Sequence, residues 1–251
     1  NIIIRMAIEK VGVHPNRVYL IGYSAGGDGA YQMGVRMADR WAGVGMMAGH
    51  PNATKQFSLA NTPFNLQVGG NDSAYNRNTV GQAWGDILKE LAIEHPGLYI
   101  NKTTIHPGLP HWMDGLDAPA LPWMHQYTRD PIPTKVIWQQ NNPRRSQLFW
   151  VGVPLEFTKA KERISVEYDY DSNTINIIEN YSEQLVIWLN DDMMDLDQPV
   201  IVQYQGVQIF EGEVVRSVQN IYDSSVDRAD STMSFSAQLK VSNNAEVEVA
   251  F

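Results

Sequence analysis

The chain of 251 residues contains no cysteine, which excludes disulfides and a cysteine nucleophile. Basic residues are also few, since 19 Lys and Arg face 28 Asp and Glu, for a formal net charge of −9. Nucleic acids and anionic membranes are bound by clustered Lys and Arg, so this balance argues against both as partners. No long uncharged apolar run could span a bilayer. With 43% hydrophobic residues, the sequence predicts a globular protein of one large domain or two smaller ones.

The most informative motif that is present is a Gly-x-Ser-x-Gly run at 22–26. An apolar, strand-like segment leads directly into it, and helix-forming residues follow, which is the context of a nucleophile elbow. A nucleophile elbow would place the Ser24 side chain above the edge of the sheet. The backbone N–H of Ala25 would then point at the developing oxyanion. Gly22 and Gly26 are expected to give the clearance that a side chain would block. The alternative is a plain glycine turn between a strand and a helix.

A serine nucleophile needs a base that is oriented by an acid, and the two candidates follow later strands. Asp72 comes just past an apolar segment that ends at Gly69, and His111 comes after the strand-like segment 99–106. We therefore predict Asp72 as the acid and His111 as the base. His106, still on the strand, is expected to be a packed structural histidine. Three other carboxylates are weaker candidates for the acid and are expected instead to be helix-end caps: Asp28, Asp114 and Asp117.

Two patterns of hydrophobic residues divide the chain. Up to about residue 130, strand and helix signals alternate, which predicts an α/β fold with a mostly parallel sheet. The predicted strands are 17–22, 41–49, 63–69 and 99–106, and the predicted helices 2–10, 27–39, 76–95 and 118–127. Period-two alternation then predicts strands at 164–168, 175–177, 185–189, 200–204, 207–210 and 234–241. This second part predicts an all-β domain, a small antiparallel sandwich of about seven strands. The expected domains are 1–142 and 143–251.

Three loops together resemble those of a known family. The elbow GYSAGG, the loop VGGND and the loop GLPHWM are similar to those of the α/β-hydrolase fold, in the esterase branch near dienelactone hydrolases and prolyl-oligopeptidase-like peptidases. The resemblance covers roughly residues 1–130, and the segment WLNDDMMDLDQPVIVQYQGVQIFEGEV resembles a β domain that follows such catalytic domains in bacterial esterases. It implies Ser24 as nucleophile, Asp72 as acid, His111 as base and Ala25 as one oxyanion donor. The implied chemistry is acyl transfer to water, without a cofactor.

The sequence departs from the family at its beginning. The elbow arrives at residue 24, whereas the family has about four strands and its second oxyanion donor before that point. The segment 17–21 is therefore expected to be an unprotected edge strand. We expect it to associate with the missing N-terminal part of the fold, either an upstream segment or a second chain. The cellular compartment stays open; a periplasmic or secreted protein would carry its signal peptide upstream of Asn1.

The sequence says less about the substrate than about the catalytic residues. Only a short loop joins the strands that end near Gly49 and begin near Pro63, which predicts an open site suited to small-molecule or polymer-attached esters. Tyr23 and Trp112 are predicted to bind substrate, with core packing as the alternative. The acidic residues at 191, 192, 195 and 197 are expected to form a solvated loop, so no metal site is predicted. The predicted function is a serine carboxylesterase, with acylated carbohydrate as one substrate class. The alternatives are a prolyl-oligopeptidase-like serine peptidase and a non-catalytic binding protein on a hydrolase fold.

Overall fold

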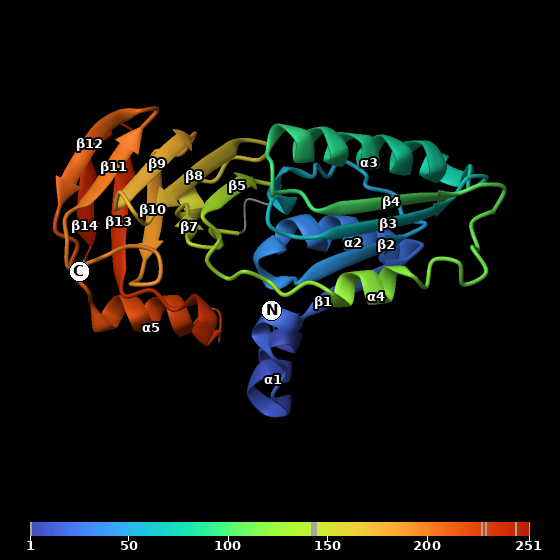
Figure 1. Cartoon of the computed structure of the whole chain (residues 1–251), viewed down its shortest axis with the longest axis horizontal. Coiled ribbons are helices and arrows are strands. Elements are labelled where there is room, and N and C mark those ends of the chain that lie inside the picture. The colour runs from blue at the N-terminus through green and yellow to red at the C-terminus, as the bar shows by residue number, and fades with distance from the viewer. Residues whose placement is uncertain (1, 142–144, 227, 229, 244, 251) are drawn as a thin grey trace. The chain divides into compact units, whose positions relative to one another are not determined.

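The computed structural model describes residues 2–141, 145–226, 228, 230–243 and 245–250, which form two compact units (Figure 1). One unit consists of residues 16–130, and the other of residues 1–15 together with 131–251. The predicted domain boundary at 142/143 lies outside the described residues. The strand before it, β5 (Lys135–Gln139), groups with the second unit.

The 16–130 unit is built on a four-stranded parallel sheet with the order β1-β2-β3-β4. Its strands are β1 (Tyr19–Tyr23), β2 (Gly43–Met47), β3 (Phe64–Gly69) and β4 (Asn101–His106). Its α-helices are α2 (Ala25–Arg36), α3 (Arg77–Glu94) and α4 (Ala120–His125). All seven elements lie within a few residues of their predicted ranges, so this unit has the α/β architecture that the sequence predicts.

The helices cover both faces of this sheet. Val44 of β2 lies against α2, and Val68 of β3 lies against α3. On the opposite face, Met124 of α4 packs over Gly45. β2 and β3 are buried at every position, which explains why their sequences lack the polar–apolar alternation of half-exposed strands. Because the strands are parallel, the loops after β1, β3 and β4 emerge at the same edge of the sheet.

β1 is an edge strand, as the sequence predicts. It pairs with β2 on one side, and its residues are half-buried or exposed.

The second unit is mainly β-structure, arranged in two five-stranded sheets (Figure 1). One sheet has the order β14-β13-β10-β7-β6, and the other has the order β12-β11-β9-β8-β5. The strands after β5 are β6 (Gln147–Leu148), β7 (Val151–Gly152), β8 (Arg163–Asp169), β9 (Thr174–Glu179), β10 (Gln184–Leu189), β11 (Val200–Tyr204), β12 (Val207–Gly212), β13 (Ala237–Ser242) and β14 (Val247–Ala250). The helices are α1 (Ile2–Val11) and α5 (Val218–Val226).

This unit differs from the sequence prediction in three respects. It has more strands than the expected number, it contains helix α5, and its β9 and β11 pair in parallel rather than antiparallel. Trp150 joins the sheets, since its Nε1 donates to the Pro133 carbonyl at 2.8 Å and its ring packs edge-on against Tyr168.

Two of the four carboxylates in the acidic run of this unit pair with one arginine. Arg216 donates from Nε to Asp191 at 3.0 Å and from Nη1 to Asp197 at 2.7 Å. The guanidinium hydrogen bonds lower the pKa of Asp191. Over the described ranges, no group of three His, Asp or Glu side chains could hold a metal ion, and no helix is long and apolar enough to cross a membrane.

Candidate active site

The turn between β1 and α2 has the strained geometry of an elbow. Ser24 adopts φ 55° and ψ −118°, a conformation that L-residues rarely adopt and that is held only by its surroundings. Gly22 is required here, because a Cβ at this position would lie 1.9 Å from the Gly26 carbonyl oxygen. The sequence also predicts that Gly26 gives clearance, and this prediction is wrong, because a Cβ at Gly26 would meet open space. Of these two glycines, only Gly22 is needed to avoid a steric clash at the elbow.

The elbow is locked onto the end of β2. The Ser24 N–H donates to the Met47 carbonyl at 2.9 Å. Next to it, the backbones of Gly27 and Gly49 touch, and a Cβ on Gly27 would lie 2.5 Å from the Met47 oxygen. These contacts fix the start of α2, so the serine has a defined position at the edge of the sheet.

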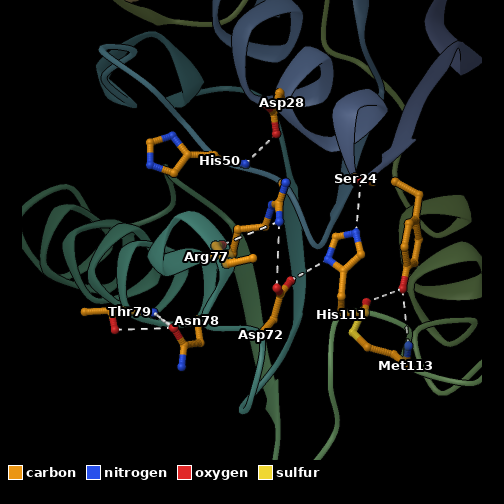
Figure 2. Close-up of polar contacts among 12 residues, drawn as sticks. Ser24, Asp28, His50, Asp72, Arg77, Asn78, Thr79, His111 and Met113 are labelled. Atoms are coloured by element: carbon orange, nitrogen blue, oxygen red, sulfur yellow. Dashed lines mark hydrogen bonds and ion pairs between the residues drawn. The ribbon is translucent and has the colours of Figure 1, made fainter.

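Ser24, His111 and Asp72 lie in a row at this edge (Figure 2). His111 Nε2 is 3.0 Å from Ser24 Oγ, and His111 Nδ1 is 2.7 Å from Asp72 Oδ2. The three side chains come from the loops after β1, β4 and β3, so the predicted proximity is observed. Both imidazole nitrogens are engaged, which fixes the plane of the ring and allows a proton to pass between Nε2 and Oγ.

The acid end of this row is buried. The Asp72 side chain is 1% exposed, and Arg77 Nη1 lies 3.8 Å from its second oxygen, Oδ1. Arg77 begins α3, and its guanidinium also lies over the Tyr75 ring, 4.8 Å from the centroid. Oδ1 has no hydrogen-bond partner among the described residues, so the positive charge of Arg77 is its main compensation. Sequence analysis did not identify Arg77, because no motif surrounds it.

The loop that carries His111 is tied to the loop that carries Asp72. The Asn71 N–H donates to the Leu109 carbonyl at 2.9 Å, and Asn71 Nδ2 donates to the Gly108 carbonyl at 3.1 Å. Gly69 permits this close approach, because a Cβ there would lie 2.1 Å from the Pro110 carbonyl oxygen. Acid and base are therefore held together by backbone contacts as well as by their own hydrogen bond.

Four aromatic residues are close in sequence to the three side chains of the site: Tyr23, Tyr75, Trp84 and Trp112. Tyr23 and Trp112 have ring centroids 5.5 Å apart, and Trp112 is largely exposed. The Tyr23 hydroxyl is engaged with the histidine loop, bonding to the carbonyl of His111 and the N–H of Met113. Tyr75 is exposed, whereas Trp84 is buried, so its ring belongs to the core. Substrate binding by Tyr23 and Trp112 stays a prediction.

The remaining candidates lie elsewhere or have other contacts. His106 Nε2 is 2.7 Å from Gln67 Oε1, in keeping with a packed structural role. Asp28 accepts a hydrogen bond from the His50 N–H at 2.7 Å, which fastens α2 to the loop after β2. Ala25 is the first residue of α2, so its N–H has no acceptor within the helix. The sequence predicts that this N–H donates to an oxyanion. That role for Ala25 also stays a prediction.

Comparisons with known proteins add little to this geometry. No protein-family model matches the chain, and no curated protein does. Among solved structures, the crystal structure of the Bacillus cereus carboxylesterase is similar to 49% of this chain, with a TM-score of 0.37 and 20% identity. The match covers 56% of that carboxylesterase, so this chain spans little more than half of its length. A likeness this weak assigns neither a function nor any residue role.

Proposed function

We propose that this protein is a serine hydrolase that cleaves carboxylic esters through an acyl-enzyme on Ser24. The observation that carries the proposal is the Ser24–His111–Asp72 row, with hydrogen-bond distances of 3.0 and 2.7 Å. The strained elbow supports it, since strain of this kind is held in place at sites where the backbone must present a side chain. The three loops also resemble those of α/β-hydrolase esterases.

The geometry supports the following course of reaction. His111 Nε2 takes the Ser24 proton as Oγ attacks the ester carbonyl, and the imidazolium that forms is stabilised by Asp72. The oxyanion is stabilised by the Ala25 N–H at the N-terminus of α2, where the helix dipole adds to the hydrogen bond. His111 then gives its proton to the leaving alkoxide. Water, activated by the same imidazole, releases the acid from Ser24.

The surroundings of the site favour a bulky alcohol group on the ester. His111 is partly exposed, and Trp112 next to it presents a large aromatic surface to solvent. An exposed aromatic face offers apolar contact area to partly apolar groups, such as the C–H faces of sugar rings. We therefore place acylated carbohydrate, free or polymer-attached, first among the ester classes to test.

The decisive experiment combines a covalent probe with two chromogenic substrates. A fluorophosphonate is expected to label the wild-type protein at Ser24, and p-nitrophenyl acetate is expected to be hydrolysed. Ser24→Ala is expected to remove labelling and to lower kcat by at least about 10³-fold, because no other group can form the acyl-enzyme. Ser73→Ala is the matched control, since Ser73 is exposed beside Asp72 and its side chain makes no capping hydrogen bond.

Three results would overturn the proposal in different ways. Activity that survives Ser24→Ala would place the nucleophile elsewhere. Cleavage of a proline-based chromogenic peptide in preference to the ester would favour a serine peptidase. Absence of both labelling and turnover would favour a binding protein on a hydrolase fold.

A further inference from the structure

Tyr23 links the nucleophile strand to the loop that carries the histidine. It is the last residue of β1 and directly precedes Ser24. Its hydroxyl donates a hydrogen bond to the His111 carbonyl at 2.6 Å and accepts one from the Met113 N–H at 3.2 Å. One side chain therefore holds the loop at His111 and again two residues later.

The ring of Tyr23 packs against the same loop. It meets the His111 ring edge-on, with centroids 5.9 Å apart and an interplanar angle of 70°. Together with Leu109, it packs against a buried apolar cluster that is formed by Met47, Ala48, Met113 and Ala120. Hydrophobic contact thus fixes the ring, and the fixed ring presents its hydroxyl to the loop.

The hydroxyl remains a donor under ordinary conditions. Burial raises the pKa of Tyr23 above its usual value, and the carboxylates of Asp117 and Asp72 act in the same direction. The hydrogen bond from the Met113 N–H acts in the opposite direction without reversing the shift. Tyr23 therefore stays protonated at neutral pH and keeps donating to the His111 carbonyl.

The two sides of His111 are held by different residues. Asn71 bonds to the carbonyls of Gly108 and Leu109, which precede the histidine. Tyr23 bonds at the histidine itself and at Met113 beyond it. Loss of the Tyr23 hydroxyl would leave the first anchor in place and release the second.

We propose that Tyr23 is a positioning residue that keeps His111 Nε2 within hydrogen-bond distance of Ser24 Oγ. The inference rests on the proposed function, in which His111 moves a proton to and from Ser24. It assigns Tyr23 a role that differs from direct contact with substrate. Because proton transfer depends steeply on alignment, a small shift of the loop slows the reaction without unfolding the protein.

Tyr23→Phe tests this role by removing only the hydroxyl. We expect kcat for p-nitrophenyl acetate to fall about tenfold, since a misplaced imidazole slows both acylation and deacylation. KM is expected to stay unchanged, because the two steps slow together and ground-state binding does not use the hydroxyl.

Tyr19→Phe is a matched control on the same strand. The Tyr19 hydroxyl also donates to a backbone carbonyl, that of Tyr127, at 2.7 Å. This control loses a hydrogen bond of the same kind at a position that contacts none of the three proposed catalytic residues. We expect it to change kcat by less than about twofold while costing similar thermal stability.

A spectroscopic readout does not depend on turnover. In the full chain labelled with ¹⁵N-histidine, we expect the His111 Nδ1–H that faces Asp72 at 2.7 Å to give a strongly downfield proton resonance, assigned by its loss in His111→Gln. We expect this resonance to shift or broaden in Tyr23→Phe and to stay in place in Tyr19→Phe. A role limited to stability would leave the resonance and kcat unchanged in both variants.

The outcomes separate failure of this inference from failure of the proposed function. Equal kcat and an equal resonance in the two variants would overturn the positioning role while Ser24→Ala still abolishes activity. A rise in KM with unchanged kcat would instead make Tyr23 a substrate-binding residue. If the wild-type protein hydrolyses no ester, the proposed function fails, and the resonance alone still decides whether Tyr23 orders the histidine.

Discussion

At the scale of single residues, the acid end of the site depends on a charge pair. Asp72 is buried, and Arg77 Nη1 lies 3.8 Å from its Oδ1. A buried carboxylate is costly unless an opposite charge accompanies it. Asp72 accepts the His111 N–H in the proposed mechanism, so we expect Arg77 to affect activity although it is expected to touch no substrate.

We predict that Arg77→Met lowers kcat/KM about tenfold, which corresponds to about 1.4 kcal/mol of transition-state stabilisation. Methionine keeps most of the apolar stem and removes the charge. Arg77→Lys, which keeps the charge, should recover most of the loss. Arg36→Met is the control, because it removes an exposed arginine from α2 and changes the net charge equally. Equal kinetics in the methionine and lysine variants would show that the charge of Arg77 is not the deciding property.

Tyr31 illustrates a polar side chain that the core of the 16–130 unit tolerates. Its side chain is completely buried, stacked on Phe64 and edge-on to Trp84. Its hydroxyl has no hydrogen-bond partner within the described part of the chain. Burial, with a smaller contribution from the Asp28 carboxylate, raises the pKa of Tyr31 far above its usual value.

We predict that Tyr31→Phe raises the free energy of unfolding by about 1 kcal/mol at pH 7, because it removes a buried unsatisfied hydroxyl. The gain should grow with pH. In the unfolded wild-type chain, Tyr31 ionises near pH 10, whereas the folded state keeps it protonated. The free energy of unfolding of the wild-type protein therefore keeps the full contribution of this group below about pH 10 and loses it as the pH rises further. The Tyr31→Phe variant has no ionisable group here, so its free energy of unfolding does not fall for this reason.

Urea unfolding at a series of pH values from about 7 to 11 measures both effects. Tyr75→Phe is the control in the same unit, since Tyr75 is exposed and its ring stays available to Arg77. Destabilisation by Tyr31→Phe would mean that the hydroxyl makes a favourable contact after all.

At the scale of secondary structure, the sequence predicts best those elements whose apolar residues are buried. The runs at β2 and β3 are buried throughout, and α3 buries Trp84, Leu88 and Leu91 on one face. Each pattern follows from the position of the element in the sheet or against it. Their ranges could therefore be derived from periodicity to within a few residues.

Several of the elements that were not predicted give only a weak local signal. α5 exposes Val218, Tyr222 and Val226, and residues with weak helix propensity fill much of the remainder. β6 and β7 are two residues long, too short for alternation to be recognised. The parallel pairing of β9 with β11 depends on which strands meet in space, and local sequence does not encode it.

The same distinction applies to the candidate site. Ser24, Asp72 and His111 could be identified because each follows a strand end within a recognisable loop. The contact of Arg77 with Asp72 depends on a tight reversal at Tyr75 and Asn76, both of which have φ near 55°. Neither residue is a glycine, and an asparagine such as Asn76 is only a weak signal for a left-handed conformation, so the sequence did not predict that reversal.

At the scale of the whole molecule, the open edge of β1 bears on association. β1 pairs with β2 on one side, and Ile21 is 49% exposed. The strand contains no Lys, Pro or bulge of the kind that natural edge strands use to avoid pairing. An unprotected edge presents free N–H and C=O groups to any strand that approaches, including the same strand of a second copy.

We predict that the chain associates through β1 as its concentration rises, and that Ile21→Lys weakens this association at least about tenfold in dissociation constant. Sedimentation velocity over a range of concentrations measures the effect. Ile93→Lys is the matched control, because Ile93 is 81% exposed on helix α3 and receives the same charge. If both variants weaken association equally, general surface charge rather than strand pairing is responsible. If the wild-type chain stays monomeric at every concentration, the edge of β1 does not recruit another strand.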